Sequence, residues 1–262
     1  MRKSICFFIL LALTIGSTAS AQPMKSLFNG KNLKNWDIFI GTALKGFEDL
    51  KLKAAPESTF SVVEKDGEKL IRVSGDVNAS LATKKEYENY HFRLEYKWGE
   101  AVYTSRNSGL LYHSYGPFGA GIGTWMSSIE LQLMHENLGD AYMMADTYAE
   151  ISVSEVGQNK VFDQAGKSLA FGNDQNGGKM ARKQQHAEKP LGEWNVVDLY
   201  CFGNTAIHVV NGVKVMECRN TGKLVNGTVA PLSKGKIQLQ SEGGEFFIRN
   251  ISIEKINRLP SN

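Results

Sequence analysis

The sequence lacks the short motifs by which several large enzyme classes are recognised. It contains no Walker phosphate-binding loop, no dinucleotide-binding glycine fingerprint, no Cys-x-x-Cys pair and no His-Glu-x-x-His. A Gly-x-Ser-x-Gly elbow is also missing, so a serine hydrolase has little support. These absences leave nucleotide-dependent, NAD-dependent and zinc-protease chemistry without a sequence signature.

Cysteine is scarce as well, with 3 residues in the chain. Cys6 lies in an apolar N-terminal stretch, whereas Cys201 and Cys218 fall in the first and third strands of a meander predicted between residues 196 and 218. Alternate strands of a sheet lie roughly 10 Å apart, which is too far for a disulfide. Both thiols are therefore predicted to be free and buried. A disulfide between them stays open if the meander is wrong.

The chain shows no internal repeat and no proline-rich linker, and it holds 6 prolines in 262 residues. Its start is typical of a secretory signal, because two basic residues precede apolar residues 5–15 and an Ala-Ser-Ala cleavage site at residues 19–21. The apolar stretch is too short for a comfortable membrane span. We therefore predict a signal peptide at residues 1–21 and a single domain at residues 22–262, located in the periplasm or secreted.

No charge bias points to a polyanionic partner. The chain has 30 basic and 27 acidic residues, and loss of the signal, with its two basic residues and no acidic one, leaves 28 against 27. A net charge near +1 gives no reason to expect nucleic acid or an anionic membrane as a partner.

Short runs of alternating apolar and polar residues recur along the chain, and few segments show helical periodicity. Tyr90–Trp98 alternates cleanly, and hairpins are predicted at Asp66-Gly67 and Asn211-Gly212. Residues 43–55 are predicted as a short helix or an ordered loop. The polar, glycine-rich residues 159–190 are predicted as a mobile surface excursion or a loop over a cleft. The whole pattern is typical of an all-β sandwich.

Two predicted strands, residues 107–113 and 128–135, carry polar groups on one face. Because side chains alternate along a strand, Glu130 and Gln132 share a face opposite Leu131. This face is either plainly solvent-exposed or the wall of a cleft. If the polar faces of further strands belong to the same sheet, they form a concave wall suited to a neutral polyhydroxylated ligand. The candidate site residues on these strands and on the loop between the first two are Asn107, His113, Trp125, Glu130, Gln132, His208, Gln240, Glu242 and Arg249.

A divalent cation stays open as a cofactor, although no metal ligands are assigned. His113, His135 and Glu136 could be arranged around a cation together with Asp140 or Asp146. Their spacing matches no diagnostic metal motif.

The order of several motifs resembles that of the 3-keto-disaccharide hydrolase domain family, once called domain of unknown function 1080. The segment SLFNGKNLKNW at residues 26–36 is similar to the opening of that family. Similar segments follow in order at Asn107-Ser108-Gly109, Ile129–Gln132, Gly192–Asn195, Val210–Gly212, Ile237–Gln240 and Phe247–Ile251. The resemblance covers roughly residues 27–256 and implies a concanavalin A-like lectin/glucanase β-sandwich, or jelly roll, with a concave polar sheet. Many members are secreted by Bacteroidota.

The resemblance also implies a reaction, the cleavage of glycosides already oxidised to a ketone at C3 of the sugar. A base removes the acidified C2 proton, the C1 leaving group departs, and water adds to the enone. On this basis Glu130 is the base, with His113 as second choice. Gln132, Asn107 and Arg249 are donors to the enolate, and Gln240 and Glu242 hold hydroxyls or act as the acid. The chain departs from the family pattern at Tyr112-His113 and at Glu242.

Two other functions remain open on the sequence. An ordinary glycosidase needs a second carboxylate, and none follows Glu130 on its own predicted strand. A non-catalytic carbohydrate-binding module would bind sugar without cleaving it and would tolerate Glu130→Gln. In each case the predicted partner is a small carbohydrate.

Overall fold

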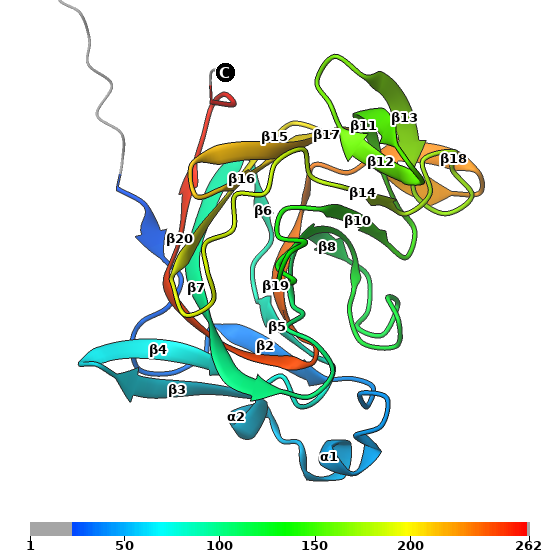
Figure 1. Ribbon diagram of the computed structural model, residues 1–262. Coiled ribbons are helices and arrows are strands. Elements are labelled where there is room, and N and C mark those ends of the chain that lie inside the picture. The colour runs from blue at the N-terminus through cyan, green and yellow to red at the C-terminus, as the bar shows by residue number, and fades with distance from the viewer. Residues whose placement is uncertain (1–22, 261–262) are drawn as a thin grey trace, which may run out of the picture.

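The computed structural model describes residues 23–260, so the predicted signal peptide and Cys6 lie outside the described residues. In that range the named strands pair antiparallel in two sheets, one of twelve strands and one of eight. Figure 1 shows the two sheets as facing layers, with β7 and β20 in one layer and β8, β10 and β19 in the other. The predicted all-β, concanavalin A-like sandwich is confirmed.

The larger sheet has a main path of nine strands and three strands beside it. In spatial order the path is β12 (Asn159–Phe162), β11 (Thr147–Val156), β17 (Val213–Val225), β16 (Thr205–Val210), β15 (Asn195–Phe202), β7 (Tyr90–Val102), β20 (Gly244–Lys255), β4 (Glu68–Val73) and β3 (Phe60–Lys65). The side strands are β1 (Lys25–Ser26) on β20, β13 (Lys167–Phe171) on β11, and β18 (Thr228–Pro231) on β17.

The smaller sheet carries the strands that matter for the site. Its order is β14 (Met180–Ala181), β10 (Ala141–Met144), β9 (Ser127–Gln132), β8 (Gly109–Tyr115), β19 (Lys234–Ser241), β5 (Ala79–Thr83) and β2 (Trp36–Ile40), with β6 (Tyr87–Glu88) beside β19.

Two short helices, α1 (Glu48–Lys53) and α2 (Pro56–Thr59), occupy and follow the irregular region predicted at residues 43–55. They lie at the lower edge of the molecule in Figure 1. Residues 23–260 contain no helix with the length and apolarity needed to cross a membrane.

The core fills the space between the two sheets, and the alternation of the strands decides which residues enter it. On β7 the side chains of Phe92, Leu94 and Tyr96 are fully buried, as predicted from the pattern of that segment. On the facing sheet, Leu110 and Ile129 belong to the same apolar cluster. Because a strand presents successive side chains to opposite faces, the intervening residues of both sheets are directed away from this core.

The predicted meander is present as β15, β16 and β17. Cys201 and Cys218 both pair with Ala206 of the central strand, one from each side. Both thiols are free and buried, as predicted. The Asn211-Gly212 and Asp66-Gly67 turns also connect the strands predicted to flank them.

The region between residues 159 and 190 is more ordered than a mobile excursion. It contains β12 and β13, which pair with β11, and β14, which pairs with β10. In Figure 1 most of these strands gather at the upper right with β18 as an extension of the larger sheet. The polar composition of this region reflects strands exposed at a sheet margin.

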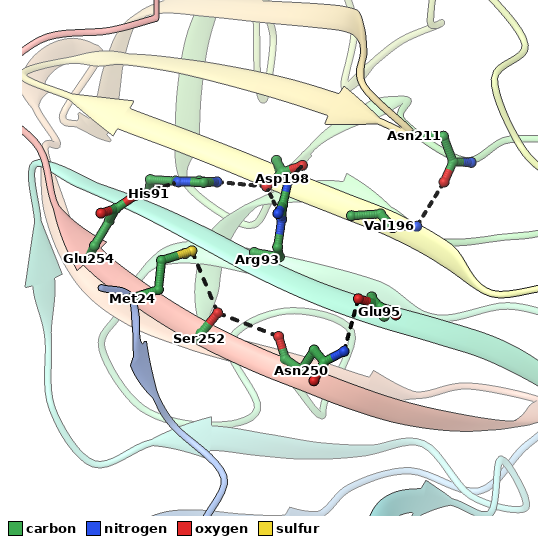
Figure 2. A network of polar contacts seen from close by, with 10 residues as sticks. All are labelled: Met24, His91, Arg93, Glu95, Val196, Asp198, Asn211, Asn250, Ser252 and Glu254. Atoms are coloured by element: carbon green, nitrogen blue, oxygen red, sulfur yellow. Dashed lines mark hydrogen bonds and ion pairs between the residues drawn. The ribbon is translucent and has the colours of Figure 1, made fainter. Parts of the chain in front are cut away.

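The outer face of the larger sheet carries several groups of bonded polar and charged side chains, shown in Figure 2. Asp198 accepts hydrogen bonds from the Arg93 guanidinium at 2.7 and 3.0 Å and lies 2.6 Å from the His91 ring. The other ring nitrogen of His91 lies 2.9 Å from Glu254. The polar groups of this face therefore bond one another across β7, β15 and β20.

The two buried thiols provide a test of the fold. Burial raises the pKa of Cys218 to about 12 and also raises the pKa of Cys201, so neither forms a thiolate near neutral pH. In protein produced without residues 1–21, Ellman's reagent should label no thiol in the native state and both thiols after denaturation. Labelling of native protein, or no labelling of unfolded unreduced protein, would contradict the meander.

Candidate active site

A small cavity on the outer face of the smaller sheet collects most of the predicted polar residues. Its volume is about 160 Å³. Its lining residues are Asn107, Ile122, Glu130, Gln132, Tyr142, Met144, Gln240 and Glu242. Five of the nine residues proposed from the sequence therefore lie together, although they come from β9, β19 and the segments next to β8 and β19.

The floor of this cavity depends on Gly109. Gly109 pairs with Gln132 on one side, and the register of Leu110 with Leu239 places Gln240 on the other. A Cβ at Gly109 would lie 2.3 Å from Glu130 Oε1 and 2.4 Å from Gln240 Oε1. Since real Cβ atoms do not approach other atoms so closely, a glycine is required for these two side chains to converge.

Two carboxyl groups share the cavity, and both are shifted toward the protonated form. Burial raises the pKa of Glu130 well above its usual value, and the negative charge of Glu242 raises it further. Burial also raises the pKa of Glu242, to about 8. Glu130 is only 3% exposed, so it is the more desolvated of the two. Such a pair is typical of acid–base catalysis.

Several amides in the cavity have unused hydrogen-bonding capacity. Asn107 Oδ1 and Gln240 Oε1 are buried and have no hydrogen-bond partner. Gln132 Oε1 accepts a hydrogen bond from the Met134 N–H at 3.0 Å, which leaves its amide nitrogen as a donor. Because buried polar groups in proteins are normally paired, the two free acceptors indicate that a ligand with hydroxyl donors completes the site.

One wall of the cavity, formed by Tyr142, Met144 and Ile122, is mainly apolar and was not predicted from the sequence. Tyr142 lies directly across from Glu130 in the β9–β10 pairing, and its phenol pKa is raised by burial and then by the two carboxyl groups. Met144 packs with Leu111 and Trp125 in a small cluster against which Tyr142 rests. The sequence of β10 is a run of four mostly apolar residues, and such a run does not specify the strand with which it pairs.

Two predicted histidines lie in the core and not in the site. His208 bonds the Tyr112 hydroxyl at 3.0 Å and the Gly139 carbonyl at 3.2 Å. His113 has a positive φ of 51° at a bulge in β8, which directs it toward Tyr90 between the sheets. The prediction of His113 as a base and of His208 as a sugar ligand is therefore wrong. The bulge breaks the strict alternation on which the first prediction rested.

Arg249 and Trp125 are also placed elsewhere. Arg249 lies on the larger sheet, where it bonds Glu95 at 2.8 Å and Glu68 at 3.0 Å and stacks on Trp194. Trp125 is 1% exposed and donates its indole N–H to the Ala79 carbonyl at 3.2 Å. It supports the apolar wall from behind, so it is not exposed to a sugar in the cavity.

Two of the residues considered as metal ligands, His135 and Asp140, are engaged with other side chains. His135 lies 3.0 Å from Glu188, and Asp140 accepts a hydrogen bond from Arg182 at 2.8 Å. Across residues 23–260, no group of three or more His, Cys, Asp or Glu side chains is arranged to hold a metal ion.

The cavity is not the largest hollow on the molecule. A hollow of about 550 Å³ at the margin of the larger sheet is lined by Lys65, Lys97 and Arg106. Its Glu245 is already paired with Arg72 at 2.6 Å, and it holds no buried pair of carboxyl groups. Chemistry, and not size, identifies the smaller cavity as the candidate active site.

Comparison with known proteins shows the family to which the chain belongs. The model of the 3-keto-alpha-glucoside-1,2-lyase-like domain matches residues 23–254, which is most of the chain. The chain belongs to this family. Membership of the 3-keto-alpha-glucoside-1,2-lyase-like family indicates a carbohydrate-active enzyme with a sugar ligand. No match was found among curated protein sequences.

The chain is also similar to several solved structures. A protein of Parabacteroides distasonis, provisionally described as a glycosyl hydrolase, is 21% identical with a TM-score of 0.52, over 90% of this chain and 100% of its own. A second such protein from that organism is 19% identical with a TM-score of 0.49, over 88% and 93%. A Bacillus subtilis protein with a galectin-like fold is 9% identical with a TM-score of 0.49, over 86% and 92%.

The close approach at Gly109 predicts the effect of a single methyl group. Gly109→Ala should displace Glu130 and Gln240 and lower the activity of the protein on its sugar substrate about 100-fold, because misplacement by roughly 1 Å has an effect of that size. The matched control is Gly99→Ala, whose Cβ would instead meet Glu245 Oε2 at 2.4 Å on the larger sheet. Equal losses in both variants would contradict the assignment.

The two core histidines predict a loss of stability in acid. Burial lowers the pKa of His113 to about 3 and that of His208 to about 4, from 6.5. The unfolded chain therefore binds protons that the folded chain refuses, and the free energy of unfolding should fall as the pH decreases from 6.5 toward 4.

His113→Leu should weaken this pH dependence. Because neither ring nitrogen of His113 has a partner, the substitution should also raise the free energy of unfolding at pH 7 by about 1 kcal/mol. Urea titrations of the variant and of the control His186→Leu, at an exposed position, measure both effects. A destabilised His113→Leu with an unchanged pH dependence would contradict the core placement.

Proposed function

We propose that this protein cleaves 3-keto-glycosides, including 3-keto-disaccharides, by elimination across the C1–C2 bond followed by hydration. The observation that carries the proposal is the pair of buried carboxyl groups, Glu130 and Glu242, whose pKa values are raised in one cavity. The unpartnered oxygens of Asn107 and Gln240 in the same cavity support a polyhydroxylated ligand. Family membership supports the keto-sugar over other sugars.

The proposed reaction uses one base and one acid. The C3 ketone acidifies the C2 proton, so a base removes it and an enolate forms. Collapse of the enolate makes a C1–C2 double bond and breaks the bond from C1 to the glycosidic oxygen, which takes a proton from the acid. Addition of water at C1 and return of a proton to C2 give the free 3-keto-sugar. Net hydrolysis therefore needs no displacement at C1.

We assign the base to Glu242 and the acid to Glu130, the reverse of the roles suggested by the sequence. Glu130 is more completely buried, and the charge of Glu242 raises its pKa further. When the pair carries one proton, that proton therefore resides on Glu130.

The enolate oxygen needs donors, and two are available beside the carboxyl groups. The amide nitrogen of Gln132 is free to donate because Met134 N–H holds the amide oxygen. The Tyr142 hydroxyl lies across the β9–β10 pair from Glu130. Preorganised donors of this kind stabilise developing negative charge without reorganisation. The oxygens of Asn107 and Gln240 then accept hydrogen bonds from sugar hydroxyls.

An ordinary two-carboxylate glycosidase remains the second candidate, and the structure removes one argument against it. The sequence places no second carboxylate on the strand of Glu130, but Glu242 reaches the same cavity from the end of β19. A carbohydrate-binding module without catalysis is the third candidate. It does not account for two buried carboxyl groups with raised pKa values.

We also propose that the protein acts in the periplasm or outside the cell. The basis is the predicted signal peptide at residues 1–21. Two free buried cysteines are compatible with that location, because burial raises their pKa values.

The deciding experiment compares 3-keto-trehalose with trehalose. The protein should cleave the ketone and leave the parent sugar intact, and deuterium at C2 of the ketone should slow the reaction, since the C2–H bond breaks only in the elimination. Cleavage of trehalose without an isotope effect would establish the glycosidase. Sugar binding without cleavage of either compound would establish the binding module.

The roles of the two carboxyl groups predict a pH profile and a set of variants. Activity should rise as the pH increases through about 8, because Glu242 must lose its proton to act as the base. Glu130→Gln and Glu242→Gln should each lower kcat by about 100-fold or more, as is typical of general acid–base groups. Glu155→Gln, at an exposed position on β11, is the control. If the rise near pH 8 disappears in Glu130→Gln but persists in Glu242→Gln, then Glu130 is the base and Glu242 is the acid.

A further inference from the structure

Ile122 has a backbone conformation that its side chain disfavours. Its φ is +49°, in the left-handed region, where a β-branched residue is a genuine outlier. In the described residues 23–260, the other non-glycine positions with positive φ are mostly Asn and Asp, and none is β-branched. Glycine, which adopts a positive φ without strain, stands on both sides of Ile122 but not at position 122 itself. Strain of this kind is found at functional sites.

The loop that carries Ile122 is held in place by close contacts. The Gly121 N–H donates to the Trp125 carbonyl at 2.8 Å, and the Trp125 N–H donates to the Gly121 carbonyl at 2.9 Å. A Cβ at Gly121 would lie 2.5 Å from the Met144 side chain. These contacts fix the backbone of the loop around a buried Trp125, so Ile122 cannot relax by moving the loop.

The Ile122 side chain lines the candidate active site but is itself 62% exposed. It lies with Tyr142 and Met144, whereas Glu130 and Gln240 contribute to the polar part of the same cavity. A large apolar side chain that is strained and mostly exposed, at the edge of a cavity, leaves apolar surface uncovered in the free protein. A bound ligand is the partner that this position can acquire.

We propose that Ile122, with Met144, forms a leaving-group subsite that selects an apolar or aromatic aglycone. This inference rests on the proposed cleavage of 3-keto-glycosides and names the substrate class of that site. The polar part of the cavity binds the hydroxyls of the keto-sugar, so the group attached through the glycosidic oxygen lies against the apolar wall. A second sugar would place hydroxyls against Ile122 without hydrogen-bond partners.

The experiment compares two 3-keto-α-glucosides, one with a phenyl and one with a glucosyl leaving group. Ile122→Gly should lower kcat/KM about tenfold for the phenyl compound, because the apolar contact is lost, and less than about twofold for 3-keto-trehalose. Each ratio compares variant and wild type on one substrate, so intrinsic leaving-group reactivity cancels. The thermal midpoint should stay the same or rise, because glycine relieves the strain at positive φ.

Ile122→Asn provides a second variant that keeps a side chain and tolerates the left-handed conformation. It should lose the same selectivity. Asp66→Gly, at φ +54° in the β3–β4 turn, is the control for a glycine at positive φ and should leave both ratios unchanged. Equal losses on the two substrates in either Ile122 variant would overturn the subsite. Failure of the wild type to cleave both compounds would instead overturn the proposed function.

Discussion

The site depends on the burial of two carboxyl groups, one of which lies against a glycine. Gly109 lets Glu130 and Gln240 approach where a methyl group would lie within 2.4 Å of both. Burial in the cavity raises the pKa of Glu130 and that of Glu242. A buried carboxylate is unfavourable, so the protein keeps at least one proton in the pair. That retained proton is what the proposed elimination donates to the leaving group.

The two sheets use the same alternation for different purposes. On the larger sheet, Asp198 and Arg249 are part of networks in which their charges are paired. On the smaller sheet, the oxygens of Asn107 and Gln240 are buried without partners. Paired polar groups are explained by their partners within the protein, whereas unpaired buried groups in a cavity point to a ligand. Together with the two buried carboxyl groups of Glu130 and Glu242, these oxygens separate the candidate site from the rest of the surface.

The predictions from sequence succeeded where a property depends on neighbours along the chain. The Asn211-Gly212 turn, the meander around it and the free state of Cys201 and Cys218 follow from local alternation and strand spacing. The predictions for His113 and His208 failed for two different physical reasons. A bulge in β8 redirects the His113 side chain into the core. The His208 side chain lies on the inward face of β16, where it bonds the Tyr112 hydroxyl. Alternation cannot report either fact.

The sequence alone determined the class of fold and the polar strand that bears Glu130 and Gln132, because both follow from a period of two in the side chains. Only the tertiary structure decided which groups meet at that strand. It brought Glu242 to Glu130 from the end of β19, and it added Tyr142 and the strained Ile122 to the lining of the same cavity. Sheet order and loop conformation determine these contacts. The residues that they bring together lie far apart in the chain, so no local pattern connects them.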